Sequence, residues 1–420
     1  MNPRPKILYL TSYDLDWPDN GGTLRNRHLV RHLSRIGDVN VLLAGDFAFE
    51  SPQRKATGGV PLLGSVQFQP TGKWSLHERL RNEFDPRFLN TDWYQARDED
   101  RDRVQRQSVA HDLVWVHTLK LANRFNRWRW PATVLDIDDI PSSLCRNGLA
   151  AAETVGGKIR HLRQAILWRR RERFLTERFD AMTVCSEADK ALLGGDQRVF
   201  VVPNGFEAPR GQARRQLTVP PRLGFVGNFK HEPNLDGIRW FSRKIWPLIL
   251  RRSPTTRLRL AGAAAEELSH IPNVDILGWI ADMESEMASW STAIVPVRTG
   301  GGTRVKIAEA FSRRCPVVAT TLGAYGYEVT SGLELWLADS PREFAAKCLR
   351  VLENPAEADA MADRACRKFL RSWTWDAQAE RVDAVVESVL KKRAAWRKIS
   401  QKNHESLQQR AGATLSPRHV

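Results

Sequence analysis

Short apolar runs alternate with amphipathic stretches through the first half of the chain. Such runs predict strands, and they lie at Lys6–Thr11, Asp38–Ala44, Leu113–Thr118, Thr133–Ile137, Ala181–Cys185 and Val199–Val202. Because these runs are apolar almost throughout, we expect both faces of each strand to be buried, as in a parallel sheet covered by helices. Helical periodicity lies between the runs, at 23–36 and 158–178. The order of strands and helices predicts a doubly wound α/β sheet with right-handed crossovers.

The alternation stops at a break and then starts again. Pro203–Asn204–Gly205, followed by a stretch up to Pro221 rich in Pro, Gly, Arg and Gln, predicts an interdomain linker. Strand-like runs return at Leu223–Val226, Arg257–Ala261, Val274–Leu277, Ala293–Val297, Val317–Thr320 and Leu333–Leu337. Helices are predicted between and after them, at 235–251, 282–289, 304–313, 341–352 and, from a stripe of valines, 376–390. The pattern therefore predicts two α/β sheets in tandem, followed by a polar tail without periodicity.

Composition narrows the class of protein. The chain has 420 residues, enough for two or three domains, and its content of 42% hydrophobic and 27% charged residues excludes a disordered chain. No apolar run reaches the roughly 18 residues of a spanning helix, and the N-terminus lacks the pattern of a signal peptide. Five cysteines without a CxxC spacing argue against a disulfide framework and structural zinc. We therefore expect a cytoplasmic protein.

The formal net charge of +16 suggests an anionic partner, which would be nucleic acid, a membrane surface or a phosphate-bearing substrate. The distribution of the charge separates these partners. Residues 158–173 carry seven basic side chains and one acidic, and residues 391–420 carry eight and one. Those two segments account for +13 of the total. The excess marks one helix and one tail, which favours a membrane surface or an anionic acceptor over nucleic acid.

Residues 158–173 allow two interpretations. They combine Ile159, Leu162, Ile166 and Leu167 with the basic side chains. One interpretation is an amphipathic helix on anionic lipid, where each basic residue adds about 1 kcal/mol. The other is a solvated charged face on a packed helix, or part of an acceptor site. The lipid interpretation places the protein on the inner face of the cytoplasmic membrane as a peripheral protein.

The strongest local motif is a glycine-rich turn between a strand and a helix. Its chemistry-bearing residues are Gly301, Gly302, Thr303, Arg304, Lys306 and Glu309. Glycines permit close backbone approach, and free amides at the helix start form an anion site. Arg304 and Lys306 oppose the helix dipole, so a bound anion would explain them, and Glu309 is placed to accept hydrogen bonds from a ribose. The alternative is a plain glycine turn with solvated charges.

Two other glycine turns follow predicted strands. Gly227 and Asn228 come directly after the first strand of the second half, with Lys230 placed to meet a phosphate. A lone lysine at such a place is more often solvated. Gly21 and Gly22 precede a helix in the first half and are placed to approach a substrate, although a glycine turn alone is a weak signal.

A histidine and three aspartates follow neighbouring strands of the first half, where ligands of open α/β sheets bind. His117 is either a substrate-orienting imidazole or a structural histidine. Asp136, Asp138 and Asp139 crowd the end of the next strand, and clustered carboxylates bind metals or shift one another's pKa. Because a match to the three-letter DxD metal motif often arises by chance, we favour substrate or structural roles and expect no metal.

Taken in order, these motifs resemble the retaining glycosyltransferases of the GT-B fold, family 4, also called group 1. The resemblance extends to the branch with the GGGTRxK motif that builds exopolysaccharide and cell-envelope glycans. The matching segments are 21–22, 112–117, 134–139, 184–189, 201–205, 225–228, 233–236, 300–310, 315–320 and 372–373. Only the GGGTRxK segment is specific by itself.

The resemblance implies two Rossmann-like domains that face each other across a cleft. Residues 1–205 would form the acceptor side and 206–375 the domain for the nucleotide-sugar donor. A helix at about 376–392 would cross back to the first domain, and 393–420 would be a basic, disordered tail.

The resemblance also implies roles for the candidate residues. The donor diphosphate would be held by Lys230, Gly301, Gly302, Thr303, Arg304 and Lys306, and Gly227 and Asn228 would also bind the donor. Glu309 would bind the ribose, His117 would contact the transferred sugar, and Gly21, Gly22, Asp136, Asp138 and Asp139 would lie on the acceptor side. Catalysis would rest on His117, Lys230, Arg304 and Lys306, without metal or cofactor. One departure matters, since Gly301 replaces the first glutamate of the family's Glu-x7-Glu motif, which leaves the donor sugar open.

We therefore expect a hexosyltransferase-type enzyme. It would move a sugar from a UDP- or GDP-sugar to a glycan or lipid-linked acceptor, with retention of anomeric configuration, in polysaccharide or cell-envelope biosynthesis. Two alternatives stay open: another GT-B activity such as a sugar-nucleotide epimerase, and a basic nucleic-acid-binding protein. The second is disfavoured because the chain has no recognisable nucleic-acid-binding motif.

Overall fold

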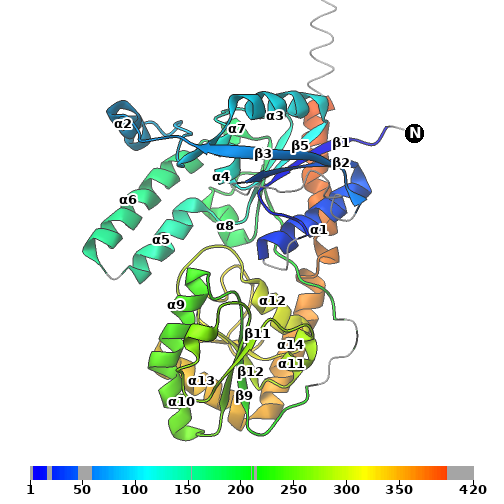
Figure 1. Ribbon diagram of the computed structural model, residues 1–420. Coiled ribbons are helices and arrows are strands. Elements are labelled where there is room, and N and C mark those ends of the chain that lie inside the picture. Colours follow the sequence, from blue (N-terminus) through cyan, green and yellow to red (C-terminus); the bar gives the residue numbers. More distant parts are fainter. Residues whose placement is uncertain are drawn as a thin grey trace, which may run out of the picture.

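A computed structural model shows two α/β domains, one above the other in Figure 1. It describes residues 3–16, 21–45, 59–152, 154–209, 211 and 215–394. Within these ranges the first sheet has eight strands in the order β4-β3-β2-β1-β5-β6-β7-β8. They are β1 (Lys6–Thr11), β2 (Asp38–Gly45), β3 (Leu62–Pro70), β4 (Tyr94–Ala96), β5 (Leu113–His117), β6 (Thr133–Ile137), β7 (Ala181–Val184) and β8 (Val199–Val201). All pairs are parallel except β3 with β4.

The second sheet is parallel throughout the described chain, in the order β11-β10-β9-β12-β13-β14. Its strands are β9 (Arg222–Val226), β10 (Arg257–Ala261), β11 (Val274–Gly278), β12 (Thr292–Val295), β13 (Val317–Ala319) and β14 (Trp336–Leu337). The two doubly wound sheets confirm the predicted α/β architecture.

Helices cover both faces of each sheet (Figure 1). Those of the first domain are α1 (Gly21–Ile36), α2 (Leu76–Phe84), α3 (Asp98–Ala110), α4 (Leu119–Arg124), α5 (Pro141–Ala151), α6 (Val155–Glu172), α7 (Leu175–Arg178) and α8 (Glu187–Leu192). Those of the second are α9 (Glu232–Trp240), α10 (Trp246–Arg252), α11 (Met283–Ala288), α12 (Val305–Ser312), α13 (Pro341–Glu353) and α14 (Pro355–Ser372). Alternate residues of one strand enter different cores: Leu8 and Leu10 pack on one face of the first sheet, Ile7 and Tyr9 on the other. Burial on both faces explains the near-continuous apolar runs.

Two predicted helices are interrupted in the structure. The stretch predicted at 235–251 holds a π-helical turn at Phe241–Ile245, between α9 and α10. Pro247 lies just after this turn, where its missing N–H cannot complete a regular helical ladder. The stretch predicted at 158–178 ends its long helix at Glu172 and continues as the short α7.

The last helix crosses back to the first domain, as the resemblance implied. Residues 379–394 are helical, and in Figure 1 this orange helix runs from the second domain up the side of the first. Val382, Val385, Val386 and Val389 are buried in the same apolar cluster as the first-domain strand β1. Most of the predicted tail, residues 395–420, lies outside the described residues.

The chain thus passes between the domains twice, and the two passages pair. The amide of Phe206 donates to the carbonyl of Trp373 at 2.9 Å, and Phe206 forms a parallel bridge with Thr374. A Cβ atom on Gly205 would lie 2.8 Å from the indole of Trp375, so only glycine permits this approach. The two crossings form one short, paired connection.

Candidate active site at the domain interface

A fully buried carboxylate, Asp136 at the end of β6, anchors the first domain's side of the site. Arg25 of α1 contacts it through Nη2 at 2.6 Å and Nε at 3.0 Å, and the hydroxyl of Thr183 on β7 also donates to it. Burial by itself would raise the pKa of Asp136, but the Arg25 charge and hydrogen bonds outweigh burial and hold that pKa well below its usual value. Asp136 therefore stays ionised and holds neighbouring side chains in place. Its side chain has no exposed surface, and its predicted place on the acceptor side stays a prediction.

His117 lies beside this carboxylate at the end of β5. Its ring is completely buried, with Nδ1 3.2 Å from Oδ2 of Asp136. Neither ring nitrogen has a well-aligned hydrogen bond within the described residues, and the ring of Tyr13 lies 5.3 Å away, centroid to centroid. A Cβ atom on Gly22 would lie 2.4 Å from the Tyr13 ring. Gly22 therefore makes room for Tyr13, which covers His117.

Asn204, from the end of the first domain, connects the two domains. Its amide nitrogen donates to Oδ1 of Asp138 at 3.0 Å and to the hydroxyl of Thr303 at 2.9 Å. Its amide oxygen accepts from Arg25 at 3.0 Å. Asn204 thereby joins the buried Arg25–Asp136 pair to the first residue after the glycine turn.

The glycine turn lies directly against Asp139. A Cβ atom on Gly301 would be 2.7 Å from Oδ1 of Asp139, and one on Gly302 would be 2.6 Å from it. Gly302 also has a φ of 64°, which favours glycine. Asn147 of α5 donates to the carbonyl of Gly300 at 2.8 Å. The turn therefore needs its glycines in order to contact the first domain.

Asp139 belongs to the first domain and lies against the glycine turn of the second, with part of its surface open to solvent. The loss of hydration and the neighbouring charge of Asp138 raise its pKa to about 7, while Arg304 opposes the shift. A carboxyl group with this pKa exchanges a proton near neutral pH.

Arg304 holds the glycine turn in shape. Its guanidinium donates to the carbonyls of Thr299 at 3.0 Å, Gly302 at 3.2 Å and Gly301. The hydroxyl of Tyr327 donates to the carbonyl of Arg304 itself at 2.9 Å. The predicted contact between Arg304 and a diphosphate stays a prediction, and the structure adds this role in shaping the loop.

Lys306 is half-buried on the first turn of α12. Its Nζ donates to Oδ1 of Asn234 at 2.7 Å and lies 4.0 Å above the ring of Phe225. Burial and, to a smaller extent, the nearby charge of Arg304 lower the pKa of Lys306 to about 7, while Glu309 opposes the shift. A Cβ atom on Gly227 would lie 3.1 Å from this Nζ, so Gly227 leaves the ammonium group its space.

The remaining predicted residues lie around these groups. Lys230 and Asn228 are exposed, and the side-chain oxygen of Asn228 accepts from the backbone amide of Lys230 at 2.9 Å. Glu309 forms an ion pair with Arg313 at 3.0 Å. A Cβ atom on Gly21 would lie 3.4 Å from a methyl group of Val305, across the interface.

Sequence reasoning did not single out several side chains that build the site: Tyr13, Arg25, Asn147, Asn204, Asp189 and Tyr325. The last two meet across the interface, with the Tyr325 hydroxyl 2.8 Å from Oδ1 of Asp189. Asp189 and Asn204 lie inside the matching segments 184–189 and 201–205, and Arg25 follows the glycine turn at Gly21 and Gly22, so these positions were the available signal.

The described residues contain no group of three or more His, Cys, Asp or Glu side chains arranged to hold a metal ion. None of their helices is both long enough and apolar enough to cross a membrane.

Comparison with protein families identifies the second domain. Residues 220–354, which include the glycine turn and Lys306, match the family described as glycosyl transferases group 1. The second domain belongs to this glycosyltransferase family. A relative from Klebsiella pneumoniae, described as an uncharacterized 44.6 kDa protein in the cps region, is 26% identical over 142 residues. That match covers 31% of this chain and 37% of the relative, little more than a third of its length.

Solved structures extend the likeness over both domains. Sucrose-phosphate synthase from Thermosynechococcus elongatus aligns with a TM-score of 0.68 at 15% identity, covering 93% of this chain and 100% of that one. Anabaena HepE, solved in complex with UDP and glucose, aligns with a TM-score of 0.59 at 17% identity, covering 91% and 100%. At such identities the likeness shows the fold, and it confirms the predicted GT-B architecture.

Proposed function

We propose that this protein is a glycosyltransferase that moves a sugar from a UDP- or GDP-sugar to a glycan or lipid-linked acceptor. We further propose that it acts with retention of anomeric configuration, as a hexosyltransferase in polysaccharide or cell-envelope biosynthesis. The observation that carries the proposal is the contact of the group 1 glycine turn with Asp139 of the first domain. The cps-region relative and the HepE complex with UDP and glucose support it.

The donor diphosphate would bind at the start of α12. Free amides at this helix start favour an anion, and Lys306 and Lys230 add positive charge. Lys306 is the informative group, because its ammonium is partly buried and its hydrogen-bond partner is a neutral amide. A diphosphate would supply the negative charge that this ammonium lacks, and Glu309 would bind the ribose.

In the proposed reaction the bond between the sugar and the diphosphate breaks, and the leaving diphosphate keeps the electron pair. The acceptor oxygen forms the new glycosidic bond and gives up its proton. We propose that Asp139 takes that proton, because its raised pKa suits the task at neutral pH and it lies against the glycine turn. The cationic loop stabilises the leaving group electrostatically, so we propose that no metal is needed and that activity survives EDTA.

Calorimetry with UDP, GDP and their sugars tests the donor proposal. We expect one of these nucleotides to bind, and Lys306→Ala to weaken its binding at least tenfold, since the variant removes a positive charge at the start of α12. Lys244→Ala, which replaces an exposed lysine of the same domain, is the matched control and should bind as wild type. The donor assignment fails if Lys306→Ala binds UDP and GDP as tightly as this control.

A lipid-linked acceptor is supported by an apolar surface on the first domain. Val155, Ile159, Leu162 and Ile166 recur at helical spacing on α6 and are 51–75% exposed. Helix α2 adds Leu76, Leu80 and Phe84, and both helices lie on the same flank in Figure 1. The predicted basic helix at 158–173 thus has an exposed apolar face flanked by basic side chains. We propose that this face binds anionic lipid, together with the basic tail.

Vesicle flotation tests the lipid contact. The protein should float with vesicles containing about a third phosphatidylglycerol, and Ile159→Asp with Leu162→Asp should abolish this, because two charges enter the apolar face. Leu333→Asp with Leu370→Asp places the same charges on exposed positions of the second domain and should float normally. Equal flotation of the two double variants would contradict the lipid proposal.

A further inference from the structure

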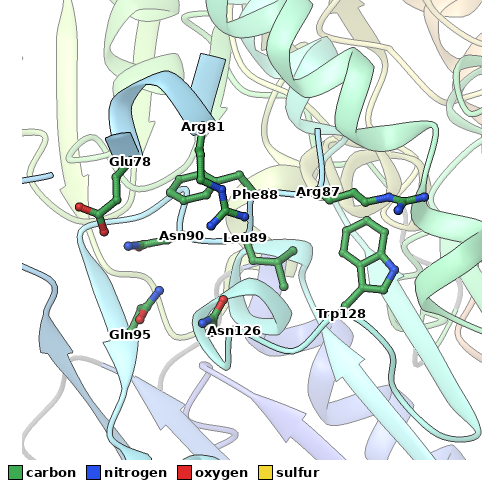
Figure 2. A pocket seen from close by; sticks show the side chains of 9 residues that line it. All are labelled: Glu78, Arg81, Arg87, Phe88, Leu89, Asn90, Gln95, Asn126 and Trp128. Atoms are coloured by element: carbon green, nitrogen blue, oxygen red, sulfur yellow. The ribbon is translucent and has the colours of Figure 1, made fainter. Parts of the chain in front are cut away.

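A cavity of about 440 Å³ lies in the first domain, away from the domain interface. It is formed by α2, the segment that follows it, β4 and the connection from α4 to β6 (Figure 2). Asn126 and Trp128 precede β6, whereas Asp138 and Asp139 follow it. The cavity and the candidate active site therefore lie at opposite ends of that strand, which spans roughly 16 Å.

Three neutral amides give the cavity its polar character: Asn90, Gln95 and Asn126. In Figure 2 they stand on the same side, below Glu78 and Arg81. Each amide both donates and accepts hydrogen bonds, which matches the dual character of a hydroxyl group. The side-chain oxygen of Asn90 is buried without a hydrogen-bond partner among the described residues, so a ligand hydroxyl would satisfy it.

The cavity's arginines are already neutralised. Arg81 pairs with Asp85 at 3.0 Å, and Arg87 pairs with Glu177 at 3.3 Å. Glu78 adds a further negative charge to the lining. The cavity therefore has no surplus positive charge for a phosphate or another strong anion.

Aromatic and apolar side chains supply the rest of the lining. The guanidinium of Arg81 lies 5.3 Å from the ring centre of Phe88, and that of Arg87 lies 5.6 Å from the ring centre of Trp128. These cation–π contacts fix the rings in place. Together with Leu89 they form an apolar wall beside the amides.

We propose that this cavity binds a neutral oligosaccharide. A sugar ring presents hydroxyl groups at its edge and C–H groups on its faces, and the amides and the apolar wall are complementary to these two kinds of surface. The inference goes beyond the proposed function, because it adds a second carbohydrate contact that is remote from the reacting groups. Such a contact would hold a glycan chain on the first domain.

Ligand-observed NMR and calorimetry with defined probes test the proposal. The probes are three neutral hexasaccharides of different linkage (maltohexaose, cellohexaose and laminarihexaose) and, as the anionic alternative, inorganic phosphate. We expect at least one hexasaccharide to bind and phosphate not to bind at this site. Asn90→Ala with Gln95→Ala should weaken hexasaccharide binding at least tenfold.

Two further variants guard against a folding defect. Asn126 has a φ of 48°, so Asn126→Gly removes its amide while keeping the backbone geometry, and this variant should also bind more weakly. Gln105→Ala removes an exposed amide from α3, outside the cavity, and should bind as wild type. The thermal midpoint of each variant is measured alongside.

Nucleotide binding is measured on the same samples, which separates this inference from the proposed function. Weaker hexasaccharide binding with unchanged nucleotide binding supports the cavity site. The site is refuted if none of the hexasaccharides binds, if only phosphate binds, or if the cavity variants bind the hexasaccharides as well as Gln105→Ala does.

Discussion

The two domains arrange their charged side chains at the candidate site in different ways. In the first domain, Arg25 and Asp136 are fully buried and cancel each other's charge. In the second domain, Arg304 and Lys306 form no salt bridge within the described residues and are held by carbonyls and an amide instead. The comparison shows that the buried Arg25–Asp136 pair is neutral by itself, whereas Arg304 and Lys306 leave positive charge for an anion.

Breaking the buried pair should have the largest effect. Arg25→Met leaves the carboxylate of Asp136 buried without its counter-charge, and we expect the free energy of unfolding to fall by about 3–5 kcal/mol. Denaturant unfolding measures this. Adding Asp136→Asn to the variant should restore part of the loss, because no unpaired charge is then buried.

A pair of similar chemistry on the surface provides the control. Arg350 and Glu357 are 2.7 Å apart but solvent-exposed, so Arg350→Ala should leave the free energy of unfolding almost unchanged. If the Arg25 and Arg350 variants lost the same stability, the contrast between buried and exposed charge would not hold.

Proton uptake on nucleotide binding tests whether Lys306 of the second domain gains its positive charge when an anion binds. At pH 8 the pKa of about 7 leaves most of Lys306 neutral in the free protein, and a bound diphosphate would favour its charged form. Binding should then take up about one proton at pH 8 and weaken as the pH rises above 7. Calorimetry in buffers of different ionisation enthalpy measures this uptake. Lys306→Arg stays charged and should take up none.

The lowered pKa of Lys306 also determines how the free energy of unfolding changes with pH. The unfolded chain holds the Lys306 proton up to its ordinary pKa, so between about pH 7 and that value the unfolded state binds more protons. Stability contributed through this residue therefore rises with pH in this range. A fall in stability of the wild type relative to Lys306→Met over the same range would contradict the lowered pKa.

The smallest effect on stability concerns Asp139. Because its pKa is raised, whereas that of Lys306 is lowered, its contribution to stability changes with pH in the opposite direction. The folded state holds its proton up to about pH 7, so stability through this group falls as the pH rises from its usual range to 7. Asp139→Asn should remove this dependence, and it should impair sugar transfer much more than nucleotide binding. Asp102→Asn, on exposed α3, is the control. Equal transfer by both variants would rule out Asp139 as the proton acceptor.

The fold was predictable where strands are buried on both faces. Lys6–Thr11, Thr133–Ile137 and Arg257–Ala261 were predicted with the bounds that the structure shows. Strand β3 was missed because only Val66 and Phe68 are buried in it, and Gly64 and two polar residues interrupt the run. Strand β4 has three residues, too few for a pattern.

In the candidate site, the sequence could reveal only those residues that follow a predicted strand or lie at a glycine turn. The pairing of Arg25 with Asp136 joins residues 111 positions apart, and no local pattern specifies such a partner. The same holds for Asn204, whose contacts lie in both domains. Arg304 was expected to face an anion, and the sequence could not show that the carbonyls of its own loop accept most of its hydrogen bonds.

Because the chain passes between the domains twice, at Phe206 and at Thr374, a single cut at one passage leaves the other intact. One cut in the peptide chain between residues 206 and 221 would not release either domain. The C-terminal fragment would carry the helix at 379–394, which is embedded in the core of the first domain. The two fragments would stay together as a non-covalent pair, so the protein lends itself to being made from two separately expressed pieces.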